Sequence, residues 1–208
     1  MSAFLGVILL GISFGINPGP PDHVTATQLV AFGQNNFGSI MWGGWLQVIG
    51  SLFIVIFAMS LVVLTNKTTE LSGLLTIVGG TLLLVVNAIE VTGYMAALSS
   101  NPLDSGFIAL DFIHSAQHLY YILAAPSVFG PLGFVIIETH VLPRIFSYTS
   151  FLLALLFALA GIYSLTLVVL SAPLLIFASV QIIWWLAAAV VVVLPAQRAR
   201  AHSWDKKF

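Results

Sequence analysis

The chain has 208 residues, of which 60% are hydrophobic and 6% are charged, and its formal net charge is −1. A soluble domain carries about a quarter charged residues, so this composition excludes a water-facing globular surface. The near-neutral charge gives no basic field for nucleic acid. Cysteine is absent, which excludes disulfides, thiolate nucleophiles and cysteine metal sites. The composition therefore predicts an all-α polytopic membrane protein.

Apolar runs of membrane-spanning length follow one another along most of the chain. A helix needs roughly 20 mainly apolar residues to cross about 30 Å of hydrocarbon. The sequence predicts six transmembrane helices in a single transmembrane domain, residues 1–208, with no room for a second folded domain. The runs lie at 3–16 with a continuation to 35, and at 39–65, 71–97, 106–139, 146–170 and 172–194.

The first and fourth runs are each too long for one straight crossing, and both contain proline. Pro18, Pro20 and Pro21 interrupt the first run, and Pro126 and Pro131 interrupt the fourth. Proline removes a backbone donor and clashes with the preceding turn. We therefore expect the first and fourth helices to be broken or kinked at these positions.

The order of the predicted helices is that of an inverted 3+3 repeat. Three helices fall at 3–97 and three at 106–194, and a broken helix leads each half. Paired broken helices in corresponding positions are typical of a transport site at the repeat interface. Prolines in membrane helices also serve packing alone, and the spacing does not decide between these two interpretations.

The basic residues predict the orientation of the helices. If the N-terminus lies inside, the inner connections are 66–70 and 140–145, followed by a tail at 195–208. The outer connections, the first of which is residues 17–38, then hold no basic residue, as the positive-inside rule requires. We expect an integral plasma (inner) membrane protein with both termini in the cytoplasm. The inner positions hold all six basic residues, Lys67, Arg144, Arg198, Arg200, Lys206 and Lys207.

Ionisable side chains within the predicted spans are the informative polar residues. Inserting one such side chain near the centre of a membrane costs about 2.5–3.5 kcal/mol of free energy, so each is expected to have a bonding partner or a functional role. Asn87 and Glu90 share one face of the third helix, and Asp111, His114 and His118 share one face of the fourth. At a rise of about 1.5 Å per residue, Glu90 and His114 fall at the same depth.

Further polar residues are predicted at the same outer level. Asp22 and His23 follow the break in the first run, and Gln47 lies on the second helix, where Gly43 and Gly50 allow a neighbouring backbone to approach closely. These positions predict one polar cavity in the outer half of the bundle, to which His114 and His118 also belong. The candidate solute- or ion-binding residues are Asn17, Asp22, His23, Gln47, Asn87, Glu90 and Asp111.

Part of this set also has metal-ligand spacing. His114 and His118 are one helical turn apart, and Asp111 and Glu90 add oxygen ligands, so these four residues form a candidate site for a divalent metal ion. Ser115 stands where a metalloprotease motif has glutamate. A stable metal site, a transient cation or proton site, and a hydrogen-bonded network that binds nothing all remain open.

The first half of the chain resembles the lysine exporter superfamily. The shared features are Asn17-Pro18-Gly19-Pro20 early in the first helix, a glycine-containing second helix, and the leucine-rich segment 74–84 centred on Gly79-Gly80. That superfamily includes exporters of amino acids and of metal ions, built from two inverted three-helix repeats. The resemblance implies a secondary transporter.

The same stretch resembles the signature of nickel and cobalt permeases, in which a histidine is followed by an Asp-His pair. Asp22 and His23 match the pair, and Asn17 stands where the first histidine is expected. The resemblance implies that Asp22 and His23 contact the transported ion.

These features together predict a secondary transporter of a small polar or cationic solute, with a divalent metal ion and an amino acid among the candidates. Transport would proceed by alternating access, driven by a gradient because no ATP-binding loop is present. The alternative is a membrane-embedded metalloprotein, an enzyme or a cofactor-binding subunit, in which His114 and His118 are permanent ligands. The expected partners are the lipid bilayer and the solute or metal ion, without nucleic acid, and a homo-oligomer or larger membrane complex remains open.

Overall fold

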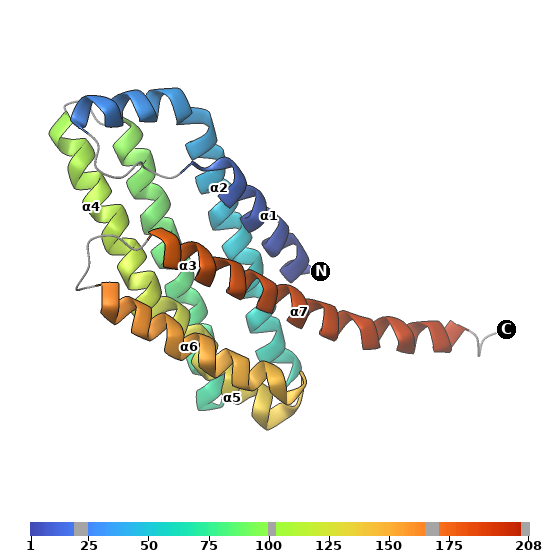
Figure 1. The fold of residues 1–208 in the computed structure, drawn as a ribbon. Coiled ribbons are helices and arrows are strands. Elements are labelled where there is room, and N and C mark those ends of the chain that lie inside the picture. Colours follow the sequence, from blue (N-terminus) through green and yellow to red (C-terminus); the bar gives the residue numbers. More distant parts are fainter. Residues whose placement is uncertain (19–24, 100–102, 165–170, 205–208) are drawn as a thin grey trace.

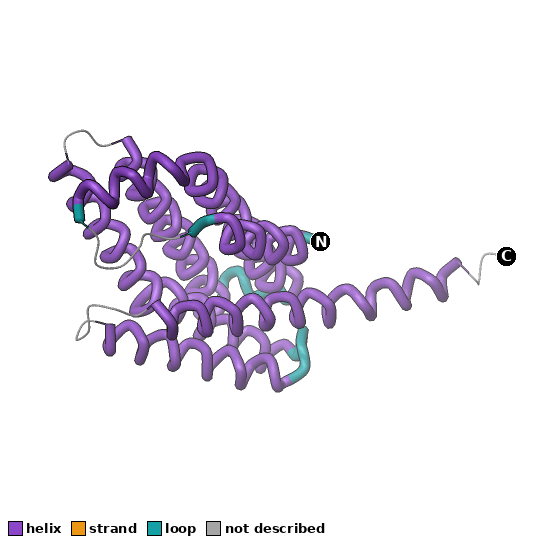
Figure 2. Tube along the Cα trace, turned by 45° about the horizontal axis from the view of Figure 1, so that its top comes forward, coloured by secondary structure: helices purple, strands orange, loops and turns teal. Residues whose placement is uncertain are grey.

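The computed structural model describes residues 1–18, 25–99, 103–164 and 171–204, and every regular element in these ranges is a helix (Figure 1). The helices form one bundle, from which the end of the last helix projects (Figures 1 and 2). In chain order they are α1 (Ser2–Ile16), α2 (Ala26–Leu64), α3 (Leu71–Ser99), α4 (Leu103–Leu119), the π-helical turn η1 (Tyr120–Ala124), α5 (Ala125–Thr139), α6 (Arg144–Ser164) and α7 (Ser171–Trp204).

Long apolar helices confirm the expectation of a helical membrane protein. Among the described residues, four helical stretches are long and apolar enough to cross a membrane, and two shorter apolar helices accompany them. Large apolar side chains such as Leu155 and Ile162 are exposed on the outside of the bundle, where lipid suits them and water does not. The long stretches are Ala31–Leu64, Leu71–Ala96, Asp111–Thr139 and Arg144–Ser164, and the shorter helices are Ser2–Ile16 and Ser179–Val193.

Helix α2 begins inside the connection that the sequence predicts at 17–38 and is continuous from Ala26 onward. It begins at a capping box, in which the Thr25 hydroxyl accepts from the backbone of Gln28 and the Gln28 side chain accepts from the backbone of Thr25. No proline follows in this stretch, so the polar residues at 33–38 do not interrupt the helix. The first turns of α2 lie across one end of the bundle before the helix bends along it (Figure 1).

Helices α1 and α2 pack against each other in antiparallel orientation through small residues. A Cβ atom on Gly6 would lie 2.8 Å from the carbonyl oxygen of Gly50, and one on Gly50 would lie 2.9 Å from the Leu10 side chain. Further along, the Ser13 hydroxyl donates a 2.7 Å hydrogen bond to the carbonyl of Gly43. The expectation that Gly43 and Gly50 allow a close backbone approach is therefore confirmed.

The predicted break in the fourth run is a widened turn rather than an interruption of the helix. The turn η1 joins α4 to α5, and the backbone N–H of Ala125 donates to the carbonyl of Tyr120, five residues earlier. Pro126 follows in the first turn of α5, where its missing N–H is tolerated. A single π-helical turn of this kind is frequent at functional sites.

The second proline of this run determines how α3 meets α5. Pro131 has no N–H, so the carbonyl of Ser127 loses its helical donor. Gly79 of α3 lies directly against that carbonyl, because a Cβ atom at this position would come within 2.1 Å of the Ser127 oxygen. The glycine in the leucine-rich third helix is therefore required by the contact between the α3 and α5 backbones.

The two predicted inner connections lie together at one end of the bundle, here called the charged end. Lys67, between α2 and α3, forms ion pairs with Glu70 and, at 3.0 Å, with Glu138 near the end of α5. Arg144 at the start of α6 interacts with His140. The hydrogen bond to Glu70, and after it the one to Glu138, raises the pKa of Lys67 above its ordinary value. The charges at this end therefore neutralise one another.

The last helix is longer than the sequence predicts. Helix α7 passes through the predicted tail at 195–208 and continues as far as Trp204, and residues 205–208 lie outside the described part. Pro195 does not end the helix, since alanine, glutamine and arginine, all strong helix formers, follow it. Inside the bundle, Trp184 of α7 packs edge-on against Phe129 of α5 at 5.4 Å and donates to the Thr149 hydroxyl of α6.

Candidate functional site

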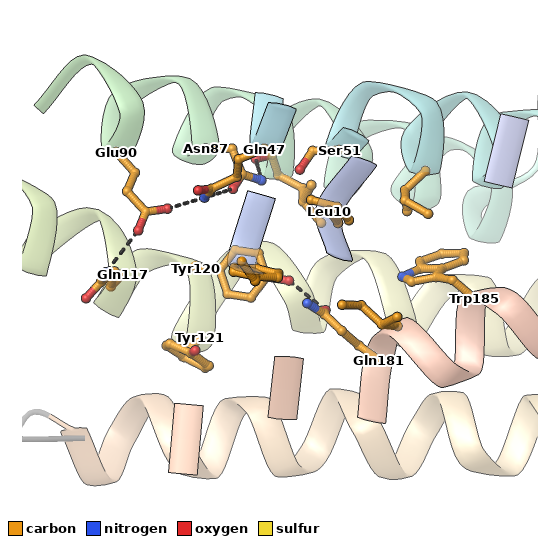
Figure 3. A pocket seen from close by; sticks show the side chains of 14 residues that line it. Leu10, Gln47, Ser51, Asn87, Glu90, Gln117, Tyr120, Tyr121, Gln181 and Trp185 are labelled. Carbon is orange, nitrogen blue, oxygen red and sulfur yellow. Dashed lines mark hydrogen bonds between the residues drawn. The ribbon is translucent and has the colours of Figure 1, made fainter. Parts of the chain in front are cut away.

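Glu90 is the centre of a polar cluster contributed by three helices. Its Oε2 accepts a 2.7 Å hydrogen bond from Nε2 of Gln47 on α2, and its Oε1 accepts a 2.9 Å hydrogen bond from Nε2 of Gln117 on α4 (Figure 3). Glu90 itself lies on α3 and is half-buried. Both carboxylate oxygens are therefore held by neutral amide donors from opposite sides.

The orientation of the Gln47 amide is fixed by a chain of hydrogen bonds along α3. The side-chain NH₂ of Asn87 donates to the carbonyl of Leu83 at 3.0 Å, which leaves the Asn87 oxygen as an acceptor. That oxygen accepts from Nε2 of Gln47 at 3.1 Å. Gln47 must therefore direct its NH₂ group toward both Asn87 and Glu90. Both oxygens of Glu90 therefore accept a hydrogen bond from a side-chain amide.

A cavity of about 160 Å³ lies beside Glu90. In Figure 3, Glu90 and Gln117 lie toward one end of the cavity and Trp185 lies toward the other, with Tyr120 between them. The volume is close to the roughly 150 Å³ of a protein cavity that binds benzene. The wall is mainly apolar, and its polar side chains include Gln47, Ser51, Asn87, Glu90, Gln117 and Gln181.

The turn η1 places two tyrosines in the wall of this cavity. The Tyr120 hydroxyl donates a 2.6 Å hydrogen bond to Oε1 of Gln181 on α7, and the rings of Tyr120 and Tyr121 meet edge-on at 5.4 Å. Tyr120 and Tyr121 are successive residues of this turn, and both line the cavity. The cavity is thus closed on this side by the fourth run and α7 together.

The described residues that line the cavity include one acidic side chain and no lysine, arginine or histidine. The ion pairs found in the described part of the chain involve Lys67 at the charged end, and none involves Glu90. Hydrogen bonds to an ionised carboxylate are stronger than those between neutral groups, but they supply no opposite charge. The site can therefore accept a cation or a proton at Glu90.

Three of the predicted binding residues, Gln47, Asn87 and Glu90, come together in this cluster. Asn17 ends α1 and packs against Gly43, where a Cβ atom would lie 2.7 Å from that of Asn17, and it does not line the cavity. The predicted residues Asp22 and His23 lie outside the described residues.

The structure does not gather the predicted residues of the fourth run around Glu90. Asp111 and His114 are exposed, and His118 makes a 2.6 Å hydrogen bond from its Nδ1 to the Ser164 hydroxyl of α6. Within the described residues no three His, Asp or Glu side chains lie close enough to hold a metal ion. The predicted metal set of Glu90, Asp111, His114 and His118 is therefore not assembled here.

The reason is the rotation of α4. The three predicted residues do share a face, but the adjacent face, with Ile113, Ala116 and Gln117, is turned toward the bundle. Both faces of a membrane helix carry apolar residues, so the position of the charges did not identify the buried face. The small and apolar residues at 113 and 116, followed by Gln117 and Tyr120, had the spacing of a buried stripe and could have indicated it.

Comparisons of the chain with protein-family models, with characterised proteins and with solved structures find no match.

Proposed function

We propose that the chain is a secondary transporter of a small polar or cationic solute, with Glu90 as the carboxylate that binds the solute or exchanges a proton with it. One observation supports this most directly. A half-buried carboxylate inside a helical membrane bundle is held by neutral donors and borders a cavity large enough for a small molecule.

The energetic argument concerns the missing counter-charge. Placing a carboxylate within a membrane helix costs about 2.5–3.5 kcal/mol even on insertion scales. A purely structural network could use a third amide at position 90 and avoid this cost. The acid at position 90 is therefore explained if its negative charge is needed. A bound cation or proton would neutralise this charge, which the neutral amides of Gln47 and Gln117 do not.

One irregular backbone segment borders the cavity and supports alternating access. The turn η1, which contributes Tyr120, widens the regular hydrogen bonding of the fourth run. A segment of this kind can absorb the backbone changes of a hinge motion.

The donor set favours an organic or monovalent solute over a divalent metal ion. A divalent cation is usually bound by several carboxylates, or by histidine together with carboxylates. The described cavity wall offers one carboxylate and several amides. A tightly held metal, as in the alternative metalloprotein, therefore receives no support from the residues that line this cavity.

We further propose six crossings with both termini on the cytoplasmic side of the plasma (inner) membrane. Lys67 and Arg144 lie at the charged end, toward which the N-terminal end of α1 also points, because α1 runs antiparallel to α2. An excess of basic residues on one side is typical of the cytoplasmic face. The inverted 3+3 repeat and membership of the lysine exporter superfamily remain proposals that rest on Asn17-Pro18-Gly19-Pro20 and on the order of the apolar runs.

The absence of cysteine allows a direct test of alternating access that does not require the solute to be known. Ser51 is buried and lines the cavity, so Ser51→Cys places a single thiol inside it. The variant is reconstituted in vesicles and treated with a membrane-impermeant maleimide, either outside or trapped inside. Alternating access predicts labelling from both sides.

Two control variants complete this experiment. Leu155→Cys, on the exposed outer face of α6, should remain unlabelled from either side because lipid covers it. Thr68→Cys, in the connection at the charged end, should be labelled from one side only. If Ser51→Cys is labelled from one side only, or from neither, the transporter proposal is contradicted.

A further inference from the structure

The charges around the cavity narrow the class of solute. A free amino acid carries a carboxylate as well as an ammonium group, and burial of that carboxylate requires a partner. The described wall contains no lysine, arginine or histidine. The amide donors nearest to Glu90, those of Gln47 and Gln117, already donate to it. The wall therefore suits a solute with a positive group and no negative one.

The hydrogen bonding of Glu90 leaves room for such a group. A carboxylate has about four acceptor sites, and the amides of Gln47 and Gln117 occupy two of them, one on each oxygen. An ammonium group offers three donors together with a full positive charge. It would therefore satisfy the remaining acceptor sites and also neutralise the carboxylate.

The opposite part of the cavity is apolar and aromatic. Leu10, Ile54 and Leu83 are each less than 10% exposed, and they line the wall together with Trp185 and Tyr120. Figure 3 shows Leu10 and Trp185 away from the Glu90 end of the cavity. Apolar side chains favour a hydrocarbon body, and aromatic faces also attract a neighbouring cation. The wall of the cavity therefore has one acidic residue at one end and mainly apolar and aromatic residues at the other, where a hydrocarbon group can bind.

The size of the cavity limits the length of the hydrocarbon body. A space of about 160 Å³ accommodates a molecule of roughly one six-membered ring, by comparison with the cavity of about 150 Å³ that binds benzene. We propose that the cavity is a binding site for a small monovalent organic cation, a primary amine with a hydrocarbon body of about this size, whose ammonium group contacts Glu90. This inference rests on the proposed transport function and specifies its substrate class.

Benzylamine is a suitable probe, because it combines one ring with one ammonium group. Its binding to the purified full chain in detergent is measured by calorimetry, beside benzyl alcohol, which has the same shape without the charge, and benzoate, which has the opposite charge. We expect benzylamine to bind more tightly than benzyl alcohol by about 30-fold or more, the factor typical of a buried charge pair, and benzoate not to bind. This series needs no variant, so it does not depend on the folding of a mutant.

Two matched variants identify the site. Glu90→Gln removes the charge and preserves the shape, and it should weaken benzylamine binding by about 30-fold or more without changing benzyl alcohol binding. Glu138→Gln makes the same chemical change at the charged end, outside the cavity, and should leave both affinities unchanged. A thermal melt of each variant shows whether it is folded.

Equal binding of benzylamine and benzyl alcohol would overturn the inference, as would benzylamine binding that is unaffected by Glu90→Gln in a folded protein. These outcomes are separable from the transport test. If Ser51→Cys is labelled from both sides while benzylamine does not bind, transport stands and the amine class fails. If benzylamine binds through Glu90 while Ser51→Cys is labelled from one side only, the amine site stands and the transporter proposal fails.

Discussion

Two glutamates of this chain, Glu90 and Glu138, have contrasting surroundings. Glu138 lies near the end of α5 and is paired with Lys67 at 3.0 Å, with the Ser72 hydroxyl also within reach. Glu90 lies within the bundle and meets the side-chain amides of Gln47 and Gln117. The first glutamate has an opposite charge beside it, whereas the second has only neutral donors.

The difference shows how a structural carboxylate can be told from a functional one. The charge of Glu138 is compensated by Lys67, so it ties the α2–α3 connection to α5 and needs nothing more. Glu90 has hydrogen-bond donors beside it but no opposite charge, which leaves it able to bind a cation or a proton. Substitutions at the two glutamates and in the structure around them test this contrast.

The largest effect is expected on transport of the probe. Glu90→Gln should lower the uptake of labelled benzylamine into vesicles by about 30-fold or more, because losing one partner of a buried charge pair costs about 2–5 kcal/mol. Glu138→Gln should leave the rate unchanged. Initial rates are taken above those of protein-free vesicles. Equal rates in the two variants would remove the contrast between the glutamates.

A smaller effect is expected when the support of Glu90 is altered. Gln47→Leu deprives both Asn87 and Glu90 of a donor, and a hydrogen bond to a charged group contributes about 1.5–3 kcal/mol. The free energy of unfolding should therefore fall by about this amount, as measured by thermal melting. Thr81→Val, which removes a polar group from the exposed face of the same α3, is the control and should have no effect.

The third prediction concerns the packing that holds η1 beside the cavity. A Cβ atom on Gly161 of α6 would lie 2.6 Å from the backbone of Ile122 in that turn, so Gly161→Ala should lower the free energy of unfolding by about 1–3 kcal/mol. At Gly130 the nearest atom is 3.9 Å away, so Gly130→Ala should be neutral or stabilise by up to about 1 kcal/mol. Melting followed by circular dichroism compares the two variants. Equal melting temperatures would show that η1 shifts to accommodate the added methyl group without loss of stability.

The smallest effect is expected at the charged end. The pKa of Lys67 is raised above its ordinary 10.5, so its ion pairs contribute fully below that pH and are lost as the pH rises through the higher folded-state value. The melting temperature of the unaltered chain should therefore fall above pH 10.5, and that of Lys67→Met should fall less over the same range. Parallel curves for the two proteins would show that the ion pairs contribute nothing.

Much of the bundle could be predicted from composition and small residues. The apolar run at 71–97 corresponds to α3, and Gly43 and Gly50 correctly marked a close helix contact. The connection predicted at 17–38 includes the polar segment 33–38, which is helical in the structure because it contains no proline. Polarity alone therefore does not end a membrane helix.

The candidate site could be predicted only in part, and the reason is rotational. Asn87 and Glu90 lie on the inner face of α3 as expected, and Gln47 meets them from α2. On α4 the charged residues indicated one face, while the uncharged Gln117, one position before His118, lies on the face that meets α3. One residue turns a helix by about 100°, so the charged face and the adjacent buried face of α4 differ by a single position, and charge counting alone does not separate them.

The contact between Gly79 and the Ser127 carbonyl has a mechanical consequence. Backbone touches backbone there, so sliding α3 along α5 by one helical turn would bring a bulky side chain, that of Leu75 or Leu83, to the place that only glycine fits. Gly79 therefore fixes the height of α3 relative to α5.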